Sequence, residues 1–216
     1  DYSYGHVDRS SVLRHIERSV TALEKGEHQF FARGLKQAHA WRAFPEFRDS
    51  CVYLDIETDG GDGVTTIGLY DGIEYVCLVR GDDLGNFPDL ISHYGMIVTF
   101  AGAMFDLPVL QRAFKGLRFD QIHIDLCPTL RMAGIRGGLK KIEKQFEIER
   151  PEGIDGLNGL DAVKLWRRFE RVKDESALEK LIAYNRADVV NLERLAEETY
   201  TIMRRIVFEA PLETVA

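Results

Sequence analysis

The sequence is poor in cysteine and contains neither a long apolar run nor an internal repeat. Its three cysteines (Cys51, Cys77 and Cys127) form no Cys-x-x-Cys pair, so we expect small buried hydrophobes rather than zinc ligands or a disulfide framework. No apolar stretch approaches the roughly 18 residues that a membrane-spanning helix needs. The N-terminus also lacks the basic-then-apolar pattern of a signal peptide. These absences predict a cytoplasmic protein with no membrane association.

Positive charge is also in short supply. There are 28 Lys and Arg residues against 35 Asp and Glu residues, which gives a formal net charge of −7. Domains that bind nucleic acid through its phosphates usually carry a basic footprint, so the overall charge gives no support to such a partner.

What is present suffices for one domain. A chain of 216 residues with 45% hydrophobic content can bury one sizeable core. We expect a helical N-terminal extension at residues 1–48, an α/β domain at 49–208 and a tail at 209–216. Asp1 in place of Met is consistent with an excised or processed piece, and further domains or a protein partner bound through the extension are then expected.

Apolar periodicity predicts a mixed five-stranded sheet flanked by helices. Asp71 and Gly72 separate two β-rich segments, which is typical of a hairpin. The expected strands are residues 51–58, 64–70, 74–79, 96–100 and 119–124. The expected helices are residues 10–25, 34–44, 107–114, 126–132, 139–146, 157–169 and 176–204.

Two acids interrupt the apolar strand at residues 51–58. Because side chains alternate between the faces of a strand, Asp55 and Glu57 share a face with Cys51 and Tyr53. Two carboxylates on one face of a core strand repel each other, and this segment holds no Lys or Arg to pair with them. Since oxygen ligands suit a divalent cation, the strand predicts one side of a metal site.

A third acid lies on the apolar stripe of the long C-terminal helix. Leu181, Tyr184, Asp188, Leu192 and Leu195 recur at spacings of three or four residues and therefore share one helix face. Periodicity alone allows a partly exposed acid at the edge of the stripe equally well. The strand acids favour a shared site, into which Tyr184 projects one turn before Asp188.

Asp106 and Asp125 each follow an expected strand. Asp is a favoured helix N-cap, and capping explains both residues without any further role. In open α/β sheets, however, functional groups gather at the carboxyl ends of strands, where Glu57 and Asp106 both lie. Asp106 is therefore a candidate fourth acid, and Asp125 a candidate accessory acid.

Three segments together resemble a known superfamily. DIET at 55–58, FAGAMFD at 100–106 and YNRAD at 184–188 resemble the three motifs of the DEDD exonucleases, in the subgroup with tyrosine in the third motif (DEDDy). WRAFPEFR at 41–48, HIDL at 123–126 and GLKK at 138–141 further resemble the YprB-type predicted exonuclease domain. The likeness spans residues 41–195 and implies a ribonuclease-H-like fold.

The resemblance also implies a chemistry. Asp55, Glu57, Asp106 and Asp188 would hold two divalent cations, Mg or Mn, and Tyr184 would orient the attacking water. The reaction would be 3′–5′ hydrolysis of phosphodiester bonds in single-stranded DNA or RNA. Ala101 departs from the pattern, because related sequences often have asparagine there.

Substrate contacts are expected at Thr58, Phe105, Arg136, Lys140 and Lys141. A solvated helix face explains the basic residues about equally well, and core packing is the favoured interpretation of Met104 and Phe105.

Two other classes of protein fit part of the pattern. A haloacid-dehalogenase-type phosphatase also begins with a strand ending in Asp-x-Asp, but the second acid here is Glu57. A non-catalytic ribonuclease-H-like module that binds nucleic acid or protein is the stronger alternative, favoured by Ala101 and the net acidity.

Overall fold

The computed structural model describes residues 8–209. The strands are β1 (Cys51–Thr58), β2 (Val64–Tyr70), β3 (Tyr75–Val79), β4 (Met96–Thr99) and β5 (Ile122–Asp125). The α-helices are α1 (Arg9–Glu24), α2 (His28–Gly34), α3 (Phe44–Phe47), α4 (Phe87–Ile91), α5 (Asp106–Ala113), α6 (Leu126–Met132), α7 (Leu139–Gln145), α8 (Gly159–Val172) and α9 (Glu175–Arg204). Short 3-10 turns (Gln37–Ala43, Arg48–Ser50 and Leu84–Asn86) and a π-helical turn (Arg205–Glu209) complete the set.

The strands form one mixed sheet in the order β3-β2-β1-β4-β5. The first three strands are antiparallel neighbours, whereas β4 and β5 run parallel to β1. The predicted five-stranded mixed sheet is therefore confirmed, with β1 at its centre.

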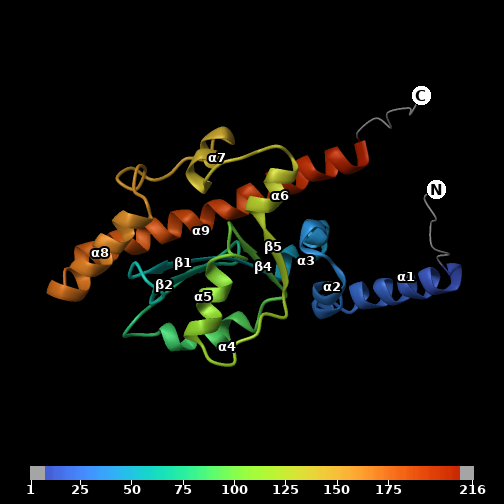
Figure 1. Cartoon of the computed structure of the whole chain (residues 1–216), viewed down its shortest axis with the longest axis horizontal. Coiled ribbons are helices and arrows are strands. Elements are labelled where there is room, and N and C mark those ends of the chain that lie inside the picture. The colour runs from blue at the N-terminus through green and yellow to red at the C-terminus, as the bar shows by residue number, and fades with distance from the viewer. Residues whose placement is uncertain (1–7, 210–216) are drawn as a thin grey trace.

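Strand β1 divides its side chains between two layers of core. Cys51 and Tyr53 face the core formed with α9, while Val52, Leu54 and Ile56 face the core formed with α4 and α5. Figure 1 shows the sheet between α9 on one side and α4 and α5 on the other. The alternation predicted from the sequence is thus observed, and it directs Asp55 and Glu57 toward α9.

The N-terminal region has two parts. Helix α1 projects from the body of the molecule (Figure 1), and its apolar side chains are 41–51% exposed (Val12, Leu13, Ile16, Val20 and Leu23). Trp41, Phe44 and Phe47, by contrast, are buried in the core beside α9.

Several predicted elements differ from those observed. The single helix expected at residues 34–44 is wrong, because Leu35 is extended and separates α2 from the turns that follow. Pro45 lies at the start of α3 instead of stopping a helix, as a residue without an N–H can. Strand β5 begins at Ile122 because its pairing with the short β4 begins there, at Met96.

The cysteine prediction is confirmed for Cys51 and Cys127, which are buried free thiols, whereas Cys77 is only half-buried. None of the helices in residues 8–209 combines the length and apolarity that crossing a bilayer requires.

Candidate metal centre

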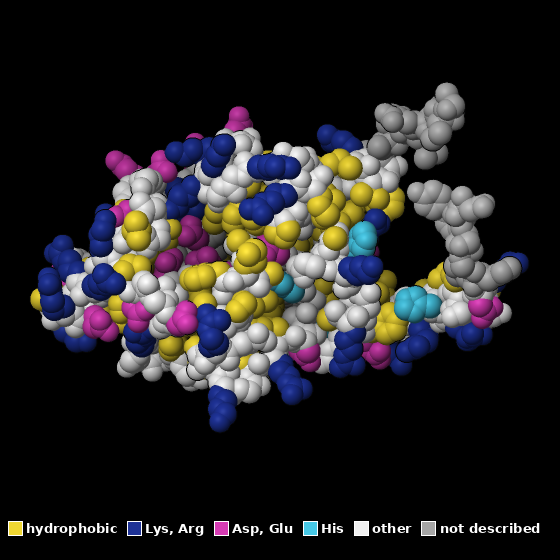
Figure 2. Space-filling model, in the orientation of Figure 1, with side chains coloured by type: hydrophobic (Ala, Val, Ile, Leu, Met, Phe, Trp, Pro, Cys, Tyr) yellow, Lys and Arg dark blue, Asp and Glu magenta, His cyan; other side chains and the backbone are white. Residues whose placement is uncertain are grey.

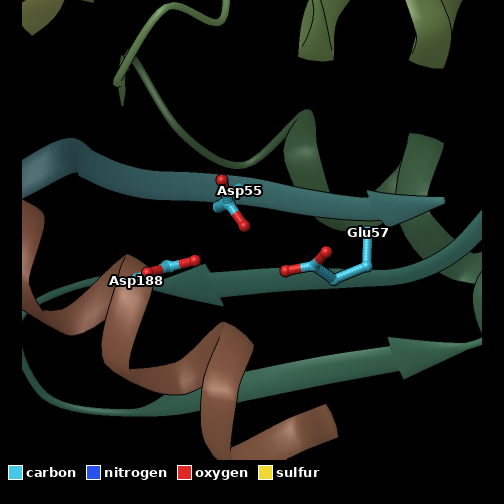
Figure 3. A group of neighbouring side chains, drawn as sticks. All are labelled: Asp55, Glu57 and Asp188. Atoms are coloured by element: carbon cyan, nitrogen blue, oxygen red, sulfur yellow. The ribbon is translucent and has the colours of Figure 1, made fainter. Parts of the chain in front are cut away.

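Three of the predicted acids meet between β1 and α9. Asp55, Glu57 and Asp188 each offer a carboxylate oxygen, and these oxygens all lie within 4.8 Å of one another. Figure 3 shows the three side chains converging from the strand and the helix on one space. Oxygens that share a cation at about 2.1–2.5 Å are up to about 4–5 Å apart, so this group can hold a divalent ion.

The electrostatics of this group favour a positive ligand. Burial, followed by the charges of neighbouring carboxylates, raises the pKa of Asp55 and of Glu57 well above the ordinary range. Glu57 is buried, while Asp55 is partly exposed. A bound cation would reverse this cost, because an opposite charge favours the ionised carboxylate.

Asp188 differs from the two strand acids because it has a cationic partner. Arg150 Nη2 lies 2.5 Å from Asp188 Oδ1, and both side chains are almost completely buried. Burial raises the pKa of Asp188, and the charge of Arg150 opposes that rise.

Asp106 lies beside the group but is turned toward β1. Its Oδ1 accepts a hydrogen bond from the Ile56 N–H at 3.2 Å. Since β4 pairs with β1 only as far as Tyr53, this carboxylate satisfies a buried backbone donor on the part of β1 beyond that pairing. Burial raises the pKa of Asp106 to about 7. Asp106 is the first residue of α5 and makes no side-chain capping bond, so the capping interpretation is wrong for this residue.

Both carboxylate oxygens of Asp125 accept hydrogen bonds from backbone N–H groups. It caps α6 through the Cys127 N–H, as the sequence predicts. Its two oxygens also accept hydrogen bonds from the N–H groups of Ala101 and Ala103, at 2.7 and 3.1 Å. Asp125 therefore fixes the loop that leads from β4 to Asp106.

Tyr184 lies beside the acidic group. It lines a cavity of about 310 Å³ together with Asp55, Asp188, Lys140 and Lys141. Lys140 Nζ donates a hydrogen bond to the Tyr184 hydroxyl at 2.8 Å and also contacts the Leu157 carbonyl. Burial raises the pKa of Tyr184, so the phenol keeps its proton.

Asn185, the residue after Tyr184, anchors Asp55. Its Nδ2 donates to the Asp55 carbonyl at 3.2 Å and to Asp55 Oδ2 at 3.0 Å. Its Oδ1 accepts a hydrogen bond from the Tyr75 hydroxyl at 2.9 Å. Asn185 fits because it lies over Gly68, which pairs with Asp55 in the sheet and has no side chain to obstruct it.

The predicted substrate contacts occupy different surroundings. Arg136 and Lys141 are exposed, whereas Lys140 is half-buried against Tyr184. Figure 2 shows acidic side chains recessed in a hollow, with Lys and Arg side chains at its rim. Thr58 ends β1 at an irregularity in its pairing with β2.

The expected core packing of Met104 and Phe105 is wrong, because these side chains are 86% and 48% exposed. Ala101, at φ +64°, belongs to the turn that presents them.

Sequence reasoning did not identify Asn185, Glu143 or Arg150. Asn185 lies on the same stripe of α9 as Leu181 and Asp188, and a buried polar residue there was a usable signal. Glu143 likewise lies beside Ile142 on the buried side of α7. Arg150 follows α7 in a loop, and no periodic pattern marks it.

The mixed sheet, the covering helix α9 and the carboxylates between them define a ribonuclease-H-like α/β domain. The model of the RNase_H superfamily matches residues 52–200, so the chain belongs to this superfamily. The predicted fold class is thus confirmed.

Among solved structures, the chain is similar to Escherichia coli RNase D, an exoribonuclease involved in structured RNA processing, with a TM-score of 0.52 and 18% identity. The match covers 78% of this chain and 43% of that one, so the chain spans less than half the length of RNase D. At this identity the likeness concerns the fold. No curated protein matches the sequence.

Proposed function

We propose that residues 49–208 form a metal-dependent 3′–5′ exonuclease of the DEDDy subgroup, similar to the YprB-type domain. The substrate is single-stranded DNA or RNA with a free 3′ end. The observation that carries this proposal is the group of three acids within 4.8 Å of one another, beside a tyrosine that lines the same cavity.

The ligand set fits two hard divalent cations, Mg²⁺ or Mn²⁺. Asp55, Glu57 and Asp188 form the compact part of the set, and Asp106 adds a fourth carboxylate nearby. When bound, such ions supply charge stabilisation for an in-line displacement and lower the pKa of the attacking water. To reach an ion, the Asp106 carboxylate would either give up the hydrogen bond that it accepts from the Ile56 N–H or bind the ion while keeping that bond.

Tyr184 orients the attacking water in this proposal. The phenol is protonated, and Lys140 donates to its oxygen, so the hydroxyl hydrogen is free to donate to another group. A donor fixed in this way positions water or a phosphate oxygen but does not remove a proton. The role proposed for Tyr184 is therefore positional, in contact with the reacting atoms.

Several side chains outside the acidic group are proposed to bind the nucleic-acid strand. Lys141, Arg136 and Thr58 are proposed to contact the sugar-phosphate backbone, as positioning contacts usually do. Phe105 presents an aromatic face next to Asp106, where the terminal base of the substrate can stack. Bound cations would offset the acidic charge at the point where the phosphate lies.

The flanking regions are assigned separate roles. Residues 1–48 are proposed as an N-terminal extension that recruits a partner or a further domain, with the exposed apolar side chains of α1 as its contact surface. The proposed tail, residues 209–216, lies outside the described residues except for Glu209.

The test uses single-stranded DNA and RNA labelled at either end, with Mg²⁺, Mn²⁺ or chelator. We expect metal-dependent shortening from the 3′ end that is abolished by Asp55→Ala and Asp188→Ala. Asp82→Ala is a matched control, because Asp82 is exposed in a loop and its carboxylate makes no hydrogen bond within residues 8–209. Absence of cleavage with every metal and both substrates would falsify the nuclease proposal and favour a non-catalytic binding module.

A further inference from the structure

A buried network of charges continues from Asp188 away from the cavity. Arg150 donates to Glu143 through Nε and Nη2, both at 2.7 Å, in a fork that matches the carboxylate. The same Nη2 lies 2.5 Å from Asp188 Oδ1. The side chains of Glu143, Arg150 and Asp188 are 1%, 3% and 8% exposed.

The network is held from two sides. Asn191, one turn after Asp188 on α9, donates to Glu143 Oε1 at 2.9 Å. Arg194 donates to the carbonyls of Phe146 and Glu147, which anchors the end of α7 on α9. Pro151 follows Arg150 directly and restricts its backbone to extended conformations. The guanidinium therefore meets Asp188 in one orientation.

A buried ion pair of this kind is not explained by stability. Taking charges out of water costs several kcal/mol each, and replacement of a buried pair by apolar side chains is often neutral or stabilising. The surroundings of Arg150 also do not favour a bound anion. The cavity of about 840 Å³ that it lines has four acidic and four basic residues, so the charges there balance.

We propose that Arg150, braced by Glu143, is a positioning residue that holds Asp188 toward Asp55 and Glu57 and thereby sets the affinity of the metal centre. This inference depends on the proposed metal-dependent function. In this inference, residues of α7 and of the loop after it orient Asp188, a metal ligand on α9. Partners that orient metal ligands in this manner typically change metal affinity by about 10–100-fold when they are removed.

The decisive variant is the double substitution Glu143→Leu/Arg150→Met. It removes the charges of Glu143 and Arg150 together, so neither of these two is left buried without the other, although Asp188 loses its cationic partner. The metal-free protein should therefore stay folded with a lowered Tm. Titration calorimetry with Mn²⁺ in the absence of nucleic acid should show affinity weakened by about 10-fold or more. Lys144→Met is the matched control, because it removes an exposed positive charge from the same helix and should leave Mn²⁺ affinity unchanged.

A second variant avoids dependence on repacking. Arg150→Lys keeps a positive charge but loses the planar fork, so we expect weakened Mn²⁺ affinity, with the cleavage rate recovering at saturating metal. Mn²⁺ affinity equal to wild type in both variants would overturn the inference, and so would an increased KM for nucleic acid at unchanged metal affinity, which would make Arg150 a substrate contact. If wild type binds no Mn²⁺, the proposed function itself fails.

Discussion

Gly68 controls how closely α9 approaches the sheet, and Gly68→Ala is the sharpest test of the site's architecture. A Cβ at this position would overlap Asn185 Oδ1 and come within 2.8 Å of Asn185 Cγ and 2.9 Å of Val189 Cγ2. The φ angle of Gly68 is not in the left-handed region, so alanine brings only the steric conflict. Either Asn185 leaves its place or α9 moves away from β2.

The expected loss of stability follows from the contacts at risk. Overpacking costs about 1–3 kcal/mol, and each of the three hydrogen bonds of Asn185 is worth about 1 kcal/mol net. Partial relaxation gives an estimate of about 2–4 kcal/mol, which lowers Tm by about 5–15 °C in a domain of this size. Since Asn185 also anchors Asp55, the stabilisation produced by Mn²⁺ should fall as well.

The assay is thermal melting with chelator and with Mn²⁺. Gly85→Ala is the control, because a Cβ there would meet no atom within 4 Å. In the double variant Gly68→Ala/Asn185→Ala the principal clash is absent, so the two losses should be less than additive by about 1–3 kcal/mol. The proposed close packing over Asp55 would be refuted if Gly68→Ala had the same Tm as wild type. It would also be refuted if the stability losses of Gly68→Ala and Asn185→Ala added exactly in the double variant.

Four further predictions follow from the site. Ala101→Asn should raise Tm by about 2–4 °C, because asparagine tolerates the left-handed backbone at φ +64° at lower cost; an unchanged or lower Tm would argue against strain there. Without metal, melting scans should show stability falling as the pH rises from about 4 to about 7. The reason is that folded Asp106, with a pKa of about 7, binds its proton more tightly than the unfolded chain does. Asp106→Asn should make this fall in stability less steep, and an unaltered pH dependence would contradict the assignment. In chelator Glu57→Gln should melt above wild type and respond less to Mn²⁺. Asp188→Asn should gain less, because it removes one of the two carboxylates that pair with the buried Arg150 charge; equal gains would contradict that pairing. Tyr184→Phe should lose most of the cleavage rate while calorimetry shows Mn²⁺ affinity retained, and loss of Mn²⁺ binding would reject the water-orienting role.

Those parts of the fold that depend on local periodicity were predictable from sequence. The bounds of β1, β2 and α6 are those expected, because alternation and turn residues define them within a few positions. Asp55, Glu57 and Asp188 could be placed in one site for the same reason. Each falls on an apolar face whose direction follows from a period of two or of 3.6 residues.

The remainder depends on contacts between distant segments. Arg150 reaches Asp188 through a loop whose course is fixed by Arg194 and Glu143, and no local pattern encodes that course. Met104 and Phe105 were expected in the core because they are apolar. The turn at Ala101, held by Asp125, instead presents them to solvent.

Helix α9 connects these observations, because successive turns of one helix hold different parts of the site. Tyr184 contacts Lys140, Asn185 holds Asp55, Asp188 meets Arg150, and Asn191 and Arg194 fix the α7 segment. Sliding the helix by one residue moves every one of these groups by about 1.5 Å, which breaks hydrogen bonds of 2.8–3.2 Å together. The geometry of the proposed metal centre is therefore set by the packing of α9 on β1 and β2. Substitutions in that packing should alter metal affinity, whereas substitutions on the exposed face of α1 should leave it unchanged.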